Sequence, residues 1–247
     1  MATKTPSKNG SVNRIKDKLP KAKKVEQTVV KIQPLNIGSL TLNLRGTSPL
    51  VVHNFGIKSR TQMLEAQMST QKAKKEPRCP EEEFLDAFYV VEGEIPKPTV
   101  NQDTRQKSYD VGEVAKFLKS ATFGLPITGF KNAIIAACRN TDYTMTQMKQ
   151  TLFLSGDKHH DWAIIKSKNS PEMDSRICRL AGAARTPIER FRPMWREWST
   201  TINIQFDANQ MTPDQVANIV AIAGFYVGVF EGRPERSSLG WGRFELV

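Results

Sequence analysis

Two segments far apart in the sequence alternate between apolar and polar residues, and they constrain the fold more than any other feature. The first lies within residues 28–44 and the second is Thr200–Phe206. Their alternating apolar residues are Leu40, Leu42 and Leu44, then Ile202, Ile204 and Phe206. A period of two residues is typical of strands that bury one face. A short apolar run at Leu50–Val52 and a final strand at Trp241–Leu246 are expected to accompany them.

Patterns typical of helices fill the region between these strands and recur after the second one. Pro80 is followed by three glutamates, and this marks a helix start because proline fits a first turn and acids favour the positive dipole end. Asp110 with Glu113 forms a capping-box pattern, and Thr212 with Gln215 forms another. We predict helices within 57–75, from Pro80, from Asp110 to Gly124, over 130–139 and 144–153, and from Thr212 to about Gly228, with loops at 92–108 and 155–171.

This order of elements predicts the fold class. Runs of helix between separated strands favour an α+β fold, with an antiparallel sheet on helices, over a doubly wound fold. A chain of 247 residues is long enough for one sizeable core. We therefore expect a single nucleic-acid-binding domain over residues 28–247, with a helical or loop insertion around 56–124, preceded by a tail over residues 1–27.

The charge of the chain is strongly positive and unevenly distributed. Its 36 basic residues exceed its 25 acidic ones, which indicates a polyanionic partner. Residues 1–27 hold eight of these cations against Asp17 and Glu26, with almost no apolar residues. Such a segment cannot offset the entropy of ordering, so we expect a disordered tail. It either keeps the protein in solution or acts as an arm that grips nucleic acid.

The sequence lacks the marks of several large classes of protein. No stretch approaches the roughly 18 consecutive apolar residues of a membrane span, and no signal-peptide pattern is present. Cys79, Cys138 and Cys178 are far apart, so we expect neither a disulfide framework nor a cysteine zinc site, and a cytoplasmic protein. The GxxxxGKS/T, GxGxxG and GxSxG motifs of nucleotide hydrolysis, dinucleotide binding and the nucleophile elbow are missing.

One segment is rich in both arginine and aromatic residues. Residues 176–196 contain six arginines and no lysine, interleaved with Phe191 and Trp195 and followed by Trp198. A guanidinium binds phosphate through two parallel hydrogen bonds and stacks on bases, whereas an ammonium does neither. Aromatic side chains between such arginines offer platforms for unpaired bases.

The alternative for this segment is a surface helix whose rings point into the core while its arginines pair with Glu189 and Glu197. We favour nucleic-acid contact, because these two acids cannot neutralise six arginines. The residues expected to make it are Arg176, Arg179, Arg185, Arg190, Arg192, Trp195 and Arg196.

Three segments together resemble a known family. They are LNLRGTSPLVVH at 42–53, LPITGFKNAIIAACR at 125–139 and GVFEGRPERSSLGWGRF at 228–244. In this order they resemble motifs of the RAMP superfamily, the RNA-binding proteins of CRISPR effector complexes, nearest to the guide-RNA-binding backbone type. A phage or mobile-element relative is a further possibility. The chain departs from the family pattern at Thr128-Gly129-Phe130, which replaces a serine pair, and at Asn132, which replaces a glycine.

The resemblance implies an RRM-like, ferredoxin-like core with inserted helical elements, and RNA held along its backbone by basic residues near the motifs. The chemistry of the residues in the third segment also favours phosphate binding. Main-chain N–H groups at Gly240 and Gly242 can approach phosphate closely, and neighbouring guanidinium groups add charge-assisted contacts. The alternative is a glycine-rich hairpin with solubilising charges. The expected contacts near these motifs are Lys131, Arg139, Arg233, Arg236, Gly240, Gly242 and Arg243.

The leading hypothesis is therefore a sequence-independent single-stranded RNA-binding protein, which associates with itself along the strand and needs neither catalysis nor cofactor. RNA is favoured over single-stranded DNA, although a phage-type DNA-binding or annealing protein has the same chemistry. A metal-free endoribonuclease using His53 as general base is another alternative, and a structural protein with a basic tail is a fourth. The cluster His159-His160-Asp161 has no spaced partner pair, so no metal is expected.

Overall fold

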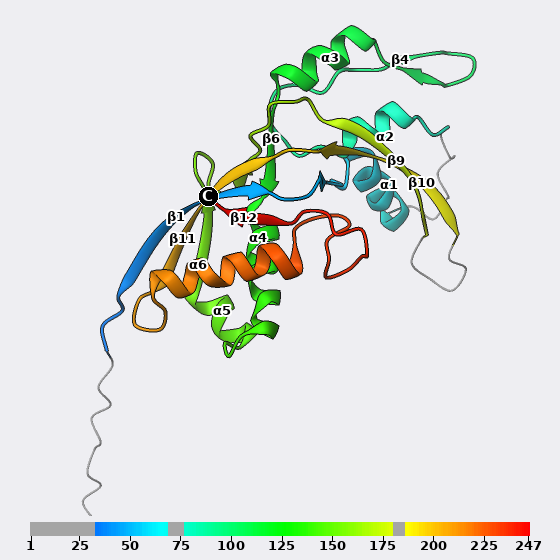
Figure 1. Cartoon of the computed structure of the whole chain (residues 1–247). Helices are drawn as coiled ribbons and strands as arrows, with labels where there is room; N and C mark the ends of the chain where they lie inside the picture. Colours follow the sequence, from blue (N-terminus) through cyan, green and yellow to red (C-terminus); the bar gives the residue numbers. More distant parts are fainter. Residues whose placement is uncertain (1–32, 69–76, 180–185) are drawn as a thin grey trace, which may run out of the picture. The chain divides into compact units, whose positions relative to one another are not determined.

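The structure is a computed structural model that describes residues 33–68, 77–179 and 186–247 (Figure 1). The chain divides into two units, Met1–Pro34 and Leu35–Val247, and the second contains the elements described below. The expected tail at 1–27 and the candidate Arg185 lie outside the described residues. The second unit combines helices with antiparallel sheets, which confirms the predicted α+β class.

Four strands form the central sheet, in which every neighbouring pair is antiparallel. Their order is β12-β1-β11-β7, and they are β1 (Ile37–Gly46), β7 (Leu152–Gly156), β11 (Ser199–Asp207) and β12 (Phe244–Leu246). The two alternating segments pair with each other, so that Leu42 lies opposite Ile202 and Leu40 opposite Ile204. Both isoleucines are fully buried, which confirms that alternation marked a half-buried sheet.

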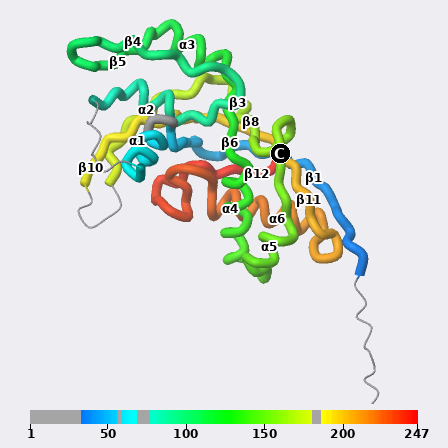
Figure 2. The backbone as a smooth tube through the Cα atoms, turned by 180° about the vertical axis from the view of Figure 1, so that it is seen from behind, coloured from blue at the N-terminus to red at the C-terminus, as the bar shows by residue number. Residues whose placement is uncertain are grey.

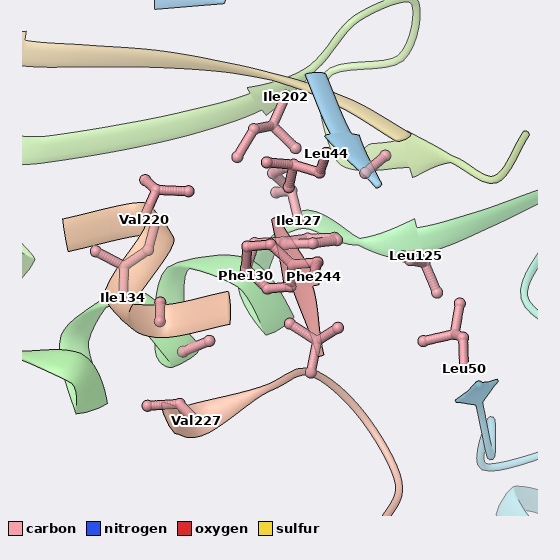
Figure 3. Close-up of a cluster of buried hydrophobic side chains, with 14 of the residues drawn as sticks. Leu44, Leu50, Leu125, Ile127, Phe130, Ile134, Ile202, Val220, Val227 and Phe244 are labelled. Atoms are coloured by element: carbon pink, nitrogen blue, oxygen red, sulfur yellow. The ribbon is translucent and has the colours of Figure 1, made fainter. Parts of the chain in front are cut away.

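Two helical segments pack against one face of this sheet. They are α4 (Ile127–Ala137) and α6 (Pro213–Ile222), and a single π-helical turn, η2 (Ala223–Val227), continues α6. The predicted capping box is present, because the Thr212 side chain accepts from the backbone N–H of Gln215. Figure 3 shows Ile134 of α4 and Val220 of α6 in one buried cluster with Ile202 of the sheet. The elements of this core follow one another as β1–α4–β7–β11–α6–β12.

The remaining elements form smaller sheets and helices beside this core. One three-stranded sheet has the order β2-β10-β9, another has the order β3-β6-β8, and β4 pairs with β5. The strands are β2 (Leu50–Val51), β3 (Val90–Glu92), β4 (Thr99–Val100), β5 (Lys107–Ser108), β6 (Thr122–Pro126), β8 (Trp162–Ile164), β9 (Glu172–Arg179) and β10 (Pro187–Trp195). The helices are α1 (Ile57–Met68), α2 (Pro80–Asp86), α3 (Val111–Ser120), the 3-10 helix η1 (Cys138–Asn140) and α5 (Met145–Thr151).

Local signals placed most helix starts correctly. α2 begins at Pro80, and the Asp110 side chain caps α3 by accepting from the backbone N–H of Glu113. Gly124, however, does not close that helix: it lies in β6, opposite Ile164. A Cβ at this position would lie 2.6 Å from Val91 Cγ2, so the glycine permits close packing of strands instead.

Two predicted loops contain strands. Residues 155–171 include the end of β7 and all of β8, and residues 92–108 include the β4–β5 hairpin. These strands have only two to five residues, too few to show a clear period. The last strand starts at Phe244 rather than Trp241. Within the described ranges, no helix is long and apolar enough to cross a membrane.

Candidate nucleic-acid interface

A hollow of about 370 Å³ lies between α4, α5 and the glycine-rich loop, which is the segment 228–243. Figure 2 shows this loop, in orange to red, beside α4. We call it the basic hollow, because its charged lining residues are Arg139, Lys149, Arg233, Glu235 and Arg236. The second and third motifs of the sequence therefore meet at one place, and three of the predicted contacts line it.

Glu235 holds the arginines of the basic hollow together. Its carboxylate accepts from Arg139 Nη1 at 3.1 Å and from Arg233 Nε at 3.2 Å, and Arg236 Nε lies 3.7 Å away. Burial acts to raise the pKa of Glu235, but the hydrogen bond and charge of Arg233, with Arg236 and Arg139, outweigh it and lower that pKa. The ionised carboxylate is outnumbered by the surrounding cations, so the hollow has an excess of positive charge.

Gly242 and Gly240 of the loop differ in whether their surroundings leave room for an anion. Gly242 has a φ of +66°, and its N–H donates to the Pro49 carbonyl at 2.8 Å. The expectation that this N–H binds phosphate is therefore wrong, because it is engaged in holding the loop to the segment before β2. Gly240 has a φ of +68°, and a Cβ there would meet nothing within 4 Å. Its open surroundings suit close approach by an anion, and its role stays a prediction.

Lys131 and Arg139 were expected to act near the two ends of one helix, but they face different elements. Arg139 lies in η1, directly after α4, and points to Glu235 of the glycine-rich loop. The Lys131 Nζ lies 4.9 Å from the centre of the Phe153 ring, which belongs to β7. Arg139 thus lines the basic hollow, whereas Lys131 makes a cation–π contact with the Phe153 ring of the central sheet.

The arginine–aromatic segment is neither a helix nor a stacking surface. It forms β9 and β10, an antiparallel pair that we call the ribbon. Trp195 is only 3% exposed and packs edge-on against Phe88, with ring centres 5.7 Å apart. Trp198 is equally buried. The stacking role predicted for Trp195 is therefore wrong, because the end of β10 pairs with β2 inside the core and no ring face is open to a base.

Several arginines of the ribbon pair with acids that lie outside the stretch considered in the sequence. Arg192 is 4% exposed, and its guanidinium donates to Asp174 at 3.0 Å and to Glu231 of the glycine-rich loop at 3.3 Å. A phosphate cannot reach it, so the prediction of nucleic-acid contact at Arg192 is wrong. Arg176 also pairs with Asp174, at 2.7 Å, and stacks over Trp241, whose ring centre is 4.6 Å away.

The other predicted arginines have mixed surroundings. Arg196 is exposed and pairs with Glu172 at 2.9 Å. Arg179 is exposed near the end of β9, and Arg190 is half-buried in β10. Arg243 is also half-buried, and its guanidinium carbon lies 5.8 Å from the centre of the Phe225 ring. Contacts by these four residues with nucleic acid stay predictions.

His53 lines a second hollow, of about 470 Å³, together with Arg190 and Phe191. Burial, followed by the charge of Arg190, lowers the pKa of His53. A neutral imidazole can accept a proton, but a general base also needs a partner that orients its ring. Within the part of the chain that the structure describes, the buried Nδ1 of His53 has no hydrogen-bond partner.

Two features of the surface were missed by the sequence analysis. Lys149 of α5 lines the basic hollow, but an isolated lysine in a polar helix gives no signal of its own. Phe225 and Tyr226 of η2 are 60% and 57% exposed. Their signal was present, since the apolar positions of the preceding helix predict a buried face that excludes them.

The structure is thus an α+β protein with a hollow whose excess positive charge favours the binding of an anion. No protein-family model matches the chain, and no curated protein matches its sequence. Among solved structures, the chain resembles one from the cryo-EM structure of the Type III-B Cmr-beta bound to cognate target RNA, with a TM-score of 0.45 and 10% identity. This likeness covers 85% of the present chain but only 59% of that chain, less than two thirds of its length.

A second solved structure that resembles the chain is the crystal structure of Cmr6 from Pyrococcus furiosus. The TM-score is 0.36 and the identity 13%, and the alignment covers 87% of the present chain and 100% of that chain. The structural likeness to both is distant.

Proposed function

We propose that this protein binds single-stranded RNA through the phosphate backbone, without sequence specificity and without catalysis. In this proposal it serves as a repeating subunit of a ribonucleoprotein. The observation that carries the proposal is the convergence of Arg139, Arg233 and Arg236 on the single carboxylate of Glu235. A guanidinium has five N–H donors in a rigid fork, so an arginine anchored by one acid keeps donors for phosphate.

The connectivity of the core supports the same proposal. The chain order β1–α4–β7–β11–α6–β12 is a βαββαβ arrangement, which is that of ferredoxin-like domains. With the strand order β12-β1-β11-β7, it fits the RRM-like core that the sequence resemblance implied. The basic hollow lies where the family-like helix motif of α4 meets the glycine-rich loop.

The experiment that tests the proposal removes the exposed cations of the hollow. Arg139→Ala with Arg236→Ala should lower the affinity for a labelled single-stranded RNA by about tenfold or more, because charge-assisted hydrogen bonds to phosphate are lost. The slope of log affinity against log salt should also fall by about one to two. Fluorescence anisotropy at two salt concentrations measures both quantities.

Arg45→Ala is the matched control. Arg45 and Arg139 have the same side-chain exposure, 62%, and each pairs with a glutamate, but Arg45 lies on β1, away from the hollow. Its loss should leave the affinity within twofold of wild type. Equal losses in the control and in the double variant would show that charge anywhere on the surface suffices and would overturn the assigned site. Competition with unlabelled DNA of the same sequence decides between RNA and single-stranded DNA.

A further inference from the structure

Phe225 and Tyr226 form an exposed aromatic pair on η2. Their ring centres are 4.9 Å apart and their planes meet at 81°. Among the ring pairs within the described residues, it alone has both rings more than half exposed. Leaving two large rings in water is unfavourable, because the burial of apolar surface stabilises a protein. An exposed pair of this kind therefore marks a surface that meets a partner.

The fold holds this pair outward on a rigid segment. The buried residues of the helical segment are Val216, Ile219, Val220, Ala223 and Val227, which recur at helical spacing. Gly224 packs so closely on β12 that a Cβ would lie 2.1 Å from the Phe244 carbonyl oxygen. Since the backbone is fixed by these contacts, the two aromatic residues cannot turn inward without breaking the core. Single π turns are frequent at functional sites.

One positive charge lies beside the pair. The Arg243 guanidinium lies 5.8 Å from the Phe225 ring centre. Its Nε is buried and, within the described residues, has no hydrogen-bond partner. η2 runs directly into Gly228, which lines the basic hollow. Phe225 and Tyr226 thus precede a lining residue of the hollow by three and two positions, and the charge of Arg243 favours nucleic acid over an apolar protein surface.

The two tryptophans of the arginine-rich segment are closed to base stacking. Trp195 and Trp198 are buried, and Phe191 is half-buried in the second hollow beside Arg190. The exposed residues along β1 include Ser39, Thr41 and Asn43, which offer no ring, and the exposed Phe153 of the edge strand β7 belongs to no ring pair among the described residues. We propose that Phe225 and Tyr226 form a stacking platform for unpaired bases, so that this protein contacts bases as well as phosphates. This proposal rests on the proposed function. It adds that this surface contacts the bases of the strand.

The test compares two probes on the full chain: a labelled single-stranded oligoribonucleotide and an abasic strand of the same length. Wild type should bind the strand with bases about tenfold more tightly, because stacking on an aromatic residue is worth roughly 1–3 kcal/mol per base. The variant Phe225→Ala with Tyr226→Ala should bind both strands alike, with the salt dependence of wild type. Both side chains are exposed, so the melting temperature should not change.

The matched control is Phe153→Ala, which removes a ring of 58% exposure from β7. It should keep the preference for bases, and Phe225→Trp with Tyr226→Phe should restore that preference. If the double alanine variant still prefers bases by about tenfold, the platform is overturned, while loss of affinity in the Arg139 and Arg236 variant would still uphold the basic hollow. Wild type that binds neither strand overturns the proposed function. Self-association that the double alanine variant loses, with base preference intact, assigns the pair to contacts between copies instead.

Discussion

The ribbon and the basic hollow are the two arginine-rich regions of the molecule, and they use arginine differently. In the ribbon, Arg192 and Asp174 are both about 5% exposed and face each other at 3.0 Å. In the basic hollow, Arg139 and Arg236 are 62% and 72% exposed and share Glu235 with Arg233. A buried, matched arginine holds the structure together, whereas exposed arginines in excess over acid are open to a ligand. Arginine content alone does not separate these two uses.

The largest expected effect tests the structural half of this comparison. Arg192→Met should destabilise the protein by at most about 3–5 kcal/mol, because Asp174 would stay buried with Arg176 as its remaining ion-pair partner. The melting temperature should fall by roughly 10 °C. Arg196→Met, which removes an exposed arginine just beyond the same ribbon, is the control and should leave the melting temperature nearly unchanged. Thermal melts followed by circular dichroism measure both variants.

A double variant sharpens this first prediction. Arg192→Met with Asp174→Asn removes both buried charges and should recover part of the stability, since a buried carboxylate that has lost a partner costs more than a missing pair. If Arg192→Met keeps its melting temperature and loses affinity for RNA instead, Arg192 belongs to the binding surface and the contrast with the hollow is wrong.

The sequence predicted those parts of the fold that depend on local chemistry. The alternation in β1 and β11, the proline at the start of α2 and the capping residues Asp110 and Thr212 each act within a few residues. The pairing of β1 with β11 spans some 160 residues, yet both strands were found, because each shows its own period. Gly124 was misread, since its role depends on a neighbouring strand.

The residues of the candidate site were likewise predicted only where local sequence signals sufficed. The motifs around Arg139 and the glycine-rich loop led to residues that the structure brings together at Glu235. The prediction was wrong for Arg192 because the acids that pair with it, Asp174 and Glu231, lie outside residues 176–196 and are brought to it only by the fold. The burial of Trp195 is likewise set by the pairing of β10 with β2.

A smaller effect concerns the acid that organises the hollow. The pKa of Glu235 is lowered in the folded protein, so its contribution to stability is present above the ordinary glutamate pKa and is lost as pH falls through the lower folded-state value. Glu235→Gln should therefore be less stable than wild type near neutral pH, by at most about 1 kcal/mol for partly exposed pairs. The difference should shrink below pH of about 4.3. A constant difference across this range in thermal melts would contradict the ion-pair account.

A still smaller effect is expected from the exposed side of the ribbon. Arg190→Ala with Arg196→Ala should change the affinity for single-stranded RNA by less than threefold, because Arg196 pairs with Glu172 and Arg190 is half-buried beside His53. Anisotropy under the conditions used for the hollow variants gives a direct comparison. A loss as large as that of the Arg139 and Arg236 variant would extend the binding surface to the ribbon and remove the distinction between the two regions.

The last prediction concerns His53, for which no measurable effect is expected. His53→Ala should leave both RNA affinity and RNA integrity unchanged, because no hydrogen bond from the described residues reaches Nδ1 of His53 to orient the ring as a general base. The lowered pKa of His53 follows from burial and from Arg190, and burial alone gives it no reacting partner. Incubating labelled RNA with wild type and variant in EDTA, followed by gel electrophoresis, measures this. Cleavage by wild type that the variant lacks would make the second hollow a catalytic site. The protein would then cleave RNA as well as bind it.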